Sequence, residues 1–309
     1  MEISPKLVGT HLKPYSAQIH WRDTMNYAAA IYDSNPLFFD DERDGGVLVH
    51  PMFSVAVTWP IVEHLSQYLD TADIPLEVLV TQVHYSEHLI FHRQIRPDEE
   101  LAIKGKIVAV LPHRAGSHIV VRFQAFDQAQ KLVFTEFNGA MLRGVQCGGA
   151  GQKEENYPAT PDGRDVHQLR WEKKITIDPL LPFIYDGCTN IVFPIHTSKK
   201  FAHLVGLPDI ILQGTATLAL AVRELIRREA ESQPWRLKEI YCRFSGMVLP
   251  GSDITLQVYE PLADQKIGCS FFDVLNQTGE KVLSHGYALI TPPAADERSE
   301  LSSAFLCFL

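Results

Sequence analysis

The chain has 309 residues, enough for one large domain or for two domains of about 150 residues each. Hydrophobic residues make up 46% and charged residues 21%, as in soluble globular proteins, and a net charge of −9 argues against nucleic acid or an anionic membrane as partner. No apolar run could span a bilayer, and five scattered cysteines without a CxxC pair predict neither disulfides nor a zinc site. We expect an intracellular, cytoplasmic protein without metal or other cofactor.

The first half begins with a short element over residues 22–33 and a turn-rich stretch over residues 34–46. A helical pattern follows over residues 52–69, where Pro60 predicts a kink or a late helix start. Alternating and β-branched residues then predict a series of strands. These strands cover residues 76–91, 101–111, 118–126 and 131–142.

The second half repeats this order. Residues 183–198 lead into the stretches 199–207 and 208–212, and a longer helix is predicted over residues 215–232. Strands are expected over residues 236–249, 253–260, 267–275 and 281–290. A helix followed by several antiparallel strands, twice over, predicts an α+β protein in which two helices are each wrapped by a curved antiparallel sheet. The two copies could pack side by side with one continuous sheet.

The two halves are separated by a stretch rich in Gly, Pro and polar residues, "GVQCGGAGQKEENYPATPDGRD". Such a composition is typical of a linker, and its "GGAG" lacks the Lys-Ser/Thr that a nucleotide loop requires. We therefore predict an N-terminal domain over 1–145, a linker over 146–168, a C-terminal domain over 169–295 and a tail over 296–309. The end, "SSAFLCFL", is not a peroxisomal Ser-Lys-Leu signal, although a peroxisomal location stays open.

Several stretches together resemble a known family. They are "RDTMNYA", "HYSEHLIFHRQIRPDEELAIKGKIVAVL", "GAMLRGVQCGG", "FAHLVGLPDIILQG" and "CRFSGMVLPGSDI". In this order they resemble the MaoC-like hydratases and dehydratases, above all the two-domain (R)-specific enoyl-CoA hydratases. The resemblance covers residues 20–292 and implies a double hot-dog fold, a 3-hydroxyacyl or 2-enoyl thioester of CoA or a carrier protein as substrate, and no cofactor. A homodimer of the two-domain unit is compatible with it.

The family's hydratase motif is Gly-Asp-x-Asn-Pro-x-His, in which Asp and His act on one water molecule. In the second half, "NIVFPIHTS" keeps Pro-x-His at Pro194 and His196, but Ile191 replaces the Asp and Phe193 replaces the Asn. One extra residue in this loop would instead bring Asn190 near the Asp position, where Asn could orient water but not accept a proton.

The start of the second predicted helix carries a further part of the resemblance. Gly214 matches the family's glycine, whose N–H polarises the thioester carbonyl as in an oxyanion hole, and Gln213 stands where the family has His. The resemblance therefore implies His196, Asn190 and Gly214 as catalytic residues. Each has an alternative: His196 could be a loop histidine packed on the helix start, and Asn190 could cap the loop.

The first half shows the converse. "DSNPLF" supplies Asp33, Asn35 and Pro36, but Phe38 replaces the histidine, and Pro51 stands where the helix-start glycine would be and offers no N–H. The resemblance implies that this half provides the acyl-binding cleft. Asp33 could serve the other site or cap its Asx-Pro turn, and His50 could line the pocket or pack.

Further residues could line the substrate pocket, and Asp186 could replace the missing carboxylate if the loop folds back. The predicted substrate-binding set is Asp33, Asn35, His50, Tyr185, Ile191, Phe193, Gln213 and Arg243.

Three functions fit this sequence. The first is a lyase that adds or removes water at a 3-hydroxyacyl or 2-enoyl thioester. The second is an isomerase or cyclase acting on a polyketide- or terpenoid-like molecule, because the apolar Ile191 and Phe193 suit a larger substrate. The third is a catalytically degenerate subunit that binds acyl groups.

Overall fold

A computed structural model describes residues 1–69, 78, 82–161, 168–261 and 266–293 of the chain. The predicted tail, most of residues 76–81 in the first predicted strand, and residues 162–167 of the predicted linker lie outside the described residues.

The first half contains helices and strands in the predicted order, preceded by two short strands and a 3₁₀ turn. Its helical elements are η1 (Pro5–Leu7), α1 (Trp21–Ala30), η2 (Pro36–Phe38), α2 (Phe53–Glu63) and α3 (Leu65–Tyr68). Its strands are β1 (Glu2–Ile3), β2 (Tyr15–Gln18), β3 (Gln82–Phe91), β4 (Glu100–His113), β5 (Gly116–Phe126), β6 (Leu132–Arg143), β7 (Gln146–Cys147) and β8 (Gln152–Lys153).

The second half repeats the plan with a longer central helix. Its helical elements are α5 (Leu181–Thr189), η3 (Pro194–His196), α6 (Lys199–Leu204), α7 (Gly214–Glu229) and η4 (Pro234–Arg236). Its strands are β9 (Leu169–Thr176), β10 (Leu237–Phe244), β11 (Asp253–Tyr259), β12 (Cys269–Asn276) and β13 (Lys281–Ile290).

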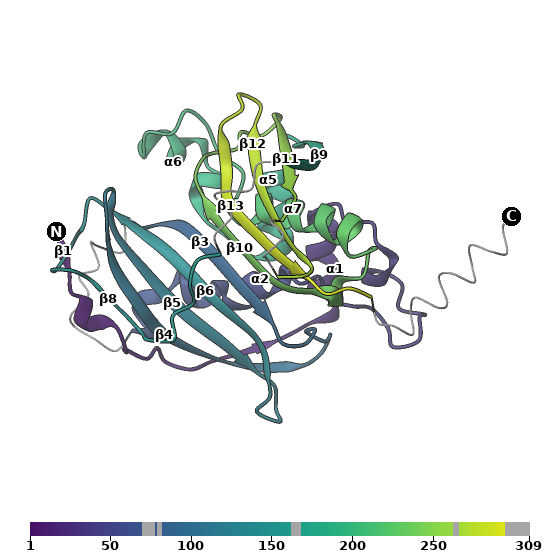
Figure 1. The fold of residues 1–309 in the computed structure, drawn as a ribbon, viewed down its shortest axis with the longest axis horizontal. Coiled ribbons are helices and arrows are strands. Elements are labelled where there is room, and N and C mark those ends of the chain that lie inside the picture. Colours follow the sequence, from purple (N-terminus) through teal and green to yellow (C-terminus); the bar gives the residue numbers. More distant parts are fainter. Residues whose placement is uncertain (70–77, 79–81, 162–167, 262–265, 294–309) are drawn as a thin grey trace, which may run out of the picture.

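The strands of both halves join into one curved sheet. Within the described residues its order is β2-β4-β5-β6-β3 in the first half and β10-β13-β12-β11-β9 in the second. The halves meet where β3 and β10 pair antiparallel, with Leu89 opposite Ile240 and His88 opposite Tyr241. Figure 1 shows β3 and β10 side by side at the centre. The predicted continuous sheet and α+β class are therefore confirmed.

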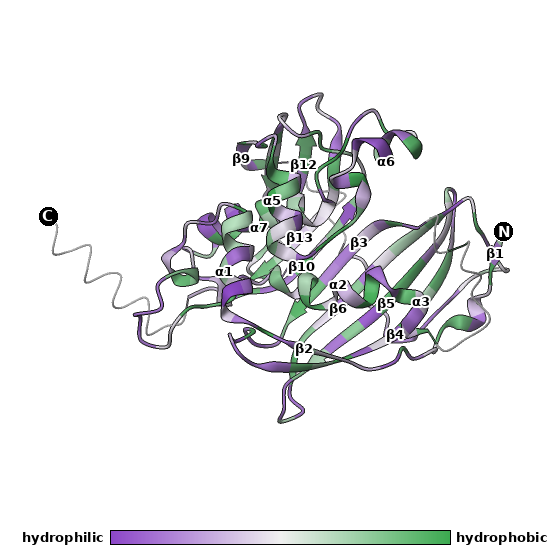
Figure 2. Ribbon diagram, turned by 180° about the vertical axis from the view of Figure 1, so that it is seen from behind, coloured by the Kyte–Doolittle hydropathy of each residue, from purple (hydrophilic) through white to green (hydrophobic). Residues whose placement is uncertain are grey.

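The helices lie on one face of this sheet. Figure 2, seen from behind, shows α1, α2, α5 and α7 in front of the strands. Buried apolar residues of α2 and α7, among them Ile61 and Leu218, share one core with inward-facing strand residues such as Leu89 and Ile240. Two helices, each against its own half of the sheet, form a double hot-dog fold.

The first central helix is shorter than predicted. It begins at Phe53, and its regular course ends at Glu63, four residues before the end of the one-turn helix α3. Pro60 has no N–H to donate and is the helix breaker that the sequence contains. The helix of the second half has no proline and runs for 16 residues.

The predicted linker lies along the first half. Within it β7 pairs with β1, β8 pairs with β4, and Tyr157 packs on Phe137 of the outer sheet face. Strands β2 and β9 were not predicted. β9 carries charged residues on its exposed positions and ends the sheet, where charge discourages pairing with another chain.

Within the described residues, no helix is both long and apolar enough to cross a membrane.

Candidate active site

The loop that carries the predicted motif has the same shape in both halves. Helix α1 is followed by Tyr32 at φ 53°, and helix α5 by Asn190 at φ 57°, both left-handed. In each half three residues then separate this position from the proline that begins a 3₁₀ turn. The loop therefore has no extra residue, and the alternative that moved Asn190 to the carboxylate position is wrong. Ile191 takes the position of Asp33.

Asn190 has the structural role that the sequence had left open. It is the C-cap of α5, and its backbone N–H donates to the Asp186 carbonyl. Asn tolerates the left-handed conformation better than most residues because its short polar side chain bonds locally. The Asn190 side chain is exposed and Ile191 is buried, so the apolar residue faces the interior where the first half has a carboxylate.

His196 lies at the end of η3, where its imidazole is fixed from behind. Its Nδ1 is 2.8 Å from the carbonyl oxygen of Ile211, and because a carbonyl only accepts, Nδ1 must carry the proton. Burial lowers the pKa of His196 to about 4, so the ring is neutral at pH 7. Its Nε2 is therefore an unprotonated base, and no hydrogen bond to it occurs within the described residues.

The start of α7 offers unpaired donors. Within the described part of the chain, the N–H groups of Gly214, Thr215 and Ala216 make no hydrogen bond, and the first bonded one is that of Thr217, which donates to the Gln213 carbonyl. Such a helix start favours negative charge on a bound atom.

Gly214 also permits a close approach that another residue would prevent. A Cβ at this position would lie 2.9 Å from Cδ1 of Phe244, the last residue of β10. The aromatic ring thus packs directly on the backbone of the helix start.

Gln213 is the N-cap of α7 and is buried. Its Nε2 donates to the Pro182 carbonyl at 3.0 Å, whereas its Oε1 is buried without a hydrogen-bond partner among the described residues. A buried oxygen without a donor is costly, so this atom is a candidate to accept a hydrogen bond from a ligand.

The first half is built differently at the equivalent place. Pro51 has no N–H, the N–H of Met52 donates to His50 Nδ1 at 3.2 Å, and that of Phe53 donates to the His50 carbonyl. The first turn of α2 therefore keeps no free donor near Pro51 for a carbonyl. Phe38 is fully buried at the position of the family histidine.

Asp33 and Asn35 shape their own turn. Asp33 Oδ1 accepts from the Asn35 N–H at 3.1 Å, and Asn35 Oδ1 accepts from the Leu37 N–H. Asn35 Nδ2 donates to the Ser232 carbonyl of the second half at 2.8 Å, which fixes the loop across the junction. Both residues therefore act as turn and junction residues, as one interpretation of "DSNP" had it.

The comparisons with known proteins agree with this architecture. Residues 167–267 match the family described as MaoC-like domain. The second half of this chain is a MaoC-like domain. Residues 6–136 match the region described as FAS1-like, dehydratase domain region, so the first half matches a dehydratase region as well. The resemblance drawn from the sequence is confirmed.

Two curated relatives and one solved structure span most of the chain. The peroxisomal multifunctional enzyme type 2 of Drosophila melanogaster is 24% identical over 85% of this chain, which spans only 43% of that protein. The 3-hydroxyacyl-thioester dehydratase Y of Mycobacterium tuberculosis is 24% identical, with 84% of this chain and 88% of the relative covered. A MaoC-like dehydratase from Phytophthora capsici has the same fold, with a TM-score of 0.79, 20% identity and coverage of 94% and 99%. The cytoplasmic location stays a prediction.

Two residues that we expected to line the pocket of the MaoC-like domain lie elsewhere. Tyr185 is fully buried, with its hydroxyl 3.2 Å from that of Tyr27 at the junction of the halves. Arg243 donates through Nε to the Tyr241 hydroxyl, on the face of β10 that turns away from the helices, because neighbouring strand residues alternate between faces. Both expectations were wrong, since they rested on position in the chain and not on the facing side chain.

The remaining predicted residues of the MaoC-like domain keep different places. Phe193 is exposed, with its ring centroid 6.4 Å from that of His196. Asp186 lies on α5 itself, where burial and the charge of Glu63 raise its carboxyl pKa. The fold-back that would make Asp186 a partner of His196 does not occur, because Asp186 is part of a regular helix.

The sequence did not reveal two contributors to the MaoC-like site. The Ile211 carbonyl is a backbone atom, so no residue type could mark it. Phe244 could have been found, because Phe91 and Phe244 each lie six residues before a proline, Pro97 and Pro250, in the corresponding strand exits of the two halves.

Proposed function

We propose that this chain adds water to, or removes water from, the C2–C3 position of an acyl thioester carried by CoA or a carrier protein. The observation that carries the proposal is the unprotonated Nε2 of His196, held by the Ile211 carbonyl, in the same half as the unpaired N–H groups of α7. A base and an oxyanion donor are the two elements that proton removal beside a thioester carbonyl needs. The relative named 3-hydroxyacyl-thioester dehydratase supports the substrate class.

In the dehydration direction, His196 Nε2 removes the proton from C2, and the Gly214 N–H stabilises the negative charge on the thioester oxygen. The C3–O bond then breaks, the new C2–C3 double bond forms, and the imidazolium returns its proton to the departing hydroxyl. Water leaves and His196 is neutral again. One residue serves as base and then as acid, as a site with Ile191 in place of a carboxylate requires.

Two further residues are assigned roles in this proposal. Gln213 Oε1, a buried acceptor, holds the substrate hydroxyl, and the apolar Ile191 faces the acyl part. Asn190 is not assigned a catalytic role, because it caps α5 and its side chain is exposed.

The test is hydration of crotonyl-CoA and of longer enoyl-CoAs by the purified chain, followed as loss of enoyl absorbance. His196→Ala should lower kcat by about 10²–10⁴-fold, the usual contribution of one acid–base group. The matched control is His203→Ala, an exposed histidine on α6 whose Nε2 contacts only the nearby Pro208 carbonyl. Absence of turnover by the wild type on all chain lengths and on carrier-bound substrate would contradict the proposal. Tight acyl-CoA binding without turnover would instead favour the degenerate acyl-binding subunit.

The buried, apolar Ile191 favours a second candidate, an isomerase or cyclase. A single base and a single donor suffice for proton transfer next to a carbonyl without loss of water. Incubation of a 3-hydroxyacyl thioester in D₂O separates the two: His196-dependent exchange at C2 without enoyl product favours the isomerase, and exchange together with enoyl product favours the hydro-lyase.

A further inference from the structure

A second cavity lies in the first half, beside the start of α2. It has a volume of about 70 Å³ and adjoins a larger open cleft of about 880 Å³. Gln94, Trp235 and Lys238 line both, so the small cavity is the inner end of the cleft. The outer volume is of the size that small-molecule sites have, and the inner one has room for a small group.

This cavity is the first-half counterpart of the candidate active site. Pro51 and Phe91 line it, and these residues correspond to Gly214 and Phe244 of the second half. It cannot perform the proposed reaction, because Pro51 has no N–H and Phe38 replaces the base. The polar groups that it does contain therefore point to binding and not to catalysis.

His50 contributes a hydrogen-bond donor to this cavity. Its Nδ1 accepts the N–H of Met52, and burial lowers its pKa to about 3, so the ring is neutral and its single proton must be on Nε2. This Nε2–H is buried without a hydrogen-bond partner among the described residues. Asp33 Oδ2 is 3.8 Å away, beyond hydrogen-bond distance.

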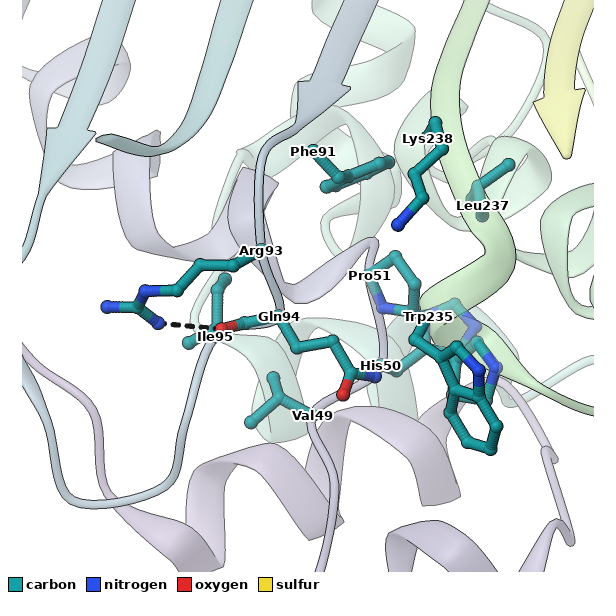
Figure 3. A pocket seen from close by; sticks show the side chains of 11 residues that line it. Val49, His50, Pro51, Phe91, Arg93, Gln94, Ile95, Trp235, Leu237 and Lys238 are labelled. Carbon is teal, nitrogen blue, oxygen red and sulfur yellow. Dashed lines mark hydrogen bonds between the residues drawn. The ribbon is translucent and has the colours of Figure 1, made fainter. Parts of the chain in front are cut away.

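Two further donors converge from different parts of the chain. Gln94 follows β3, and its Nε2 is likewise buried without a partner within the described residues. Lys238 follows the first residue of β10, and no ion pair or hydrogen bond of its ammonium group is seen in the described part of the chain. Figure 3 shows the Gln94 amide extended toward His50 and the Lys238 ammonium pointing into the cavity, while Arg93 points away from it.

The nearby arginine and carboxylates do not cancel this arrangement. Arg93 is bound to Glu99 and Asp127, so it is not an additional free cation. No carboxylate lines the inner cavity, and Asp41 and Asp98 line only the outer cleft. Three donors, one of them charged, thus meet in a wall that is otherwise mainly apolar.

We propose that this cavity binds the carboxylate of a small organic acid, whose apolar body lies along Phe91, Ile95 and Trp235. A carboxylate accepts from His50 Nε2–H, Gln94 Nε2–H and Lys238 Nζ at once, and charge-assisted hydrogen bonds of this kind are the strong ones. The site is separate from the proposed catalytic site and does not depend on its activity.

The test is binding of butyrate to the full chain, followed by ligand-observed saturation-transfer NMR and by calorimetry, with butyramide as a neutral ligand of the same shape. Butyrate should bind, and butyramide should bind at least about tenfold more weakly, because it lacks the charge that Lys238 recognises. Lys238→Met should weaken butyrate binding by about tenfold or more. Gln94→Glu, which places a like charge in the cavity, should abolish it.

Two controls fix the location. Lys173→Met, at an exposed lysine of β9, and His196→Ala in the other half should both leave butyrate affinity unchanged. The inference is overturned if butyrate and butyramide bind equally, if neither binds, or if folded Lys238→Met and Gln94→Glu bind butyrate as the wild type does. Loss of butyrate binding in His196→Ala would also overturn it, since the ligand would then occupy the other half.

Discussion

The hydroxyl groups of Tyr27 and Tyr185 lie 3.2 Å apart at the junction of the two halves. Each tyrosine lies five residues before the left-handed residue that ends its helix, Tyr32 or Asn190, so the two occupy corresponding positions. Both are fully buried, and burial raises the pKa of each, that of Tyr185 to about 12. The halves are thus joined by the β3–β10 pairing in the sheet and by this pair in the helix layer.

Tyr27→Phe should destabilise the protein by about 1–3 kcal/mol, because it leaves the buried Tyr185 hydroxyl without this partner. Tyr185→Phe should have a similar effect. The double variant Tyr27→Phe/Tyr185→Phe should cost less than the sum of the single changes, since it removes both hydroxyls together. Urea unfolding of the four proteins measures this coupling, and strictly additive losses would show that the two hydroxyls do not interact.

Much of the fold followed from the sequence, because the strands of both halves alternate apolar and polar residues in the same order. β6, predicted over residues 131–142, is observed at Leu132–Arg143. The long first-half helix was predicted too far, since Pro60 acts within it. β9 was missed because its exposed positions are charged, as suits an edge strand, and this hides the usual strand composition.

The site was less predictable, because it depends on contacts between distant residues. His196 and Gly214 were found from one conserved-looking spacing each, but the Ile211 carbonyl that orients the imidazole has no side-chain signal. Gln94 and Lys238 meet only because β3 and β10 pair in the sheet. Arg243 was misplaced because the bulge and the alternation of β10 decide which face a residue takes.

Gly214→Ala should lower kcat/KM by about tenfold or more, because the new Cβ would lie 2.9 Å from the Phe244 ring and displace it from the helix start. Gly187→Ala on α5 is the control, because a Cβ there meets nothing within 4 Å and should slightly favour the helix. Phe244→Leu in the Gly214→Ala background should restore part of the activity by making room. If Gly214→Ala keeps full activity, the close approach of Phe244 has no catalytic importance.

The activity should tolerate acid better than an ordinary histidine allows. Since burial lowers the pKa of His196 to about 4, its Nε2 stays unprotonated well below pH 6.5. The value of kcat/KM should therefore be level between about pH 5 and 8 and should fall only as the pH approaches 4. A pH–rate profile, with intrinsic fluorescence recorded in the same buffers to verify folding, gives the midpoint. A midpoint near 6.5 would contradict a desolvated His196 as the base.

Two buried carboxyl groups in the first half should make stability depend on pH in the opposite direction from the usual one. Glu87 and Glu136 are fully buried, and burial raises the pKa of both well above the usual range, with each raising the other where both would be charged. Thr58 donates to Glu136 at 2.6 Å, and Asn138 donates to both carboxyl groups. Glu87 Oε1 has no partner within the described residues.

Because the folded state keeps a proton that the unfolded state releases above about pH 4.5, this pair costs stability as the pH rises. Glu87→Gln removes that cost, so the variant should gain on the wild type between pH 5 and pH 8, by about 1.4 kcal/mol for each unit of raised pKa. Urea unfolding at both pH values measures the gain. Glu155→Gln, in the exposed linker, is the control. An equal difference at pH 5 and pH 8 would show that Glu87 is ionised in the folded protein.

Ile191→Asp should raise the rate of enoyl-CoA hydration, because Ile191 occupies the position that Asp33 has in the first half. By analogy with Asp33 and the Asn35 N–H, the new carboxylate could accept the N–H of Phe193 and so remain oriented. The change buries a carboxyl group at a position that is 2% exposed, so we expect a loss of about 1–3 kcal/mol in unfolding free energy together with a gain of about tenfold or more in kcat. Ile191→Asn controls for polarity without a proton acceptor, because an amide cannot take up a proton at neutral pH. Equal rates for the Asp and Asn variants would mean that a carboxylate at this position does not reach the reacting atoms, and that His196 must act alone.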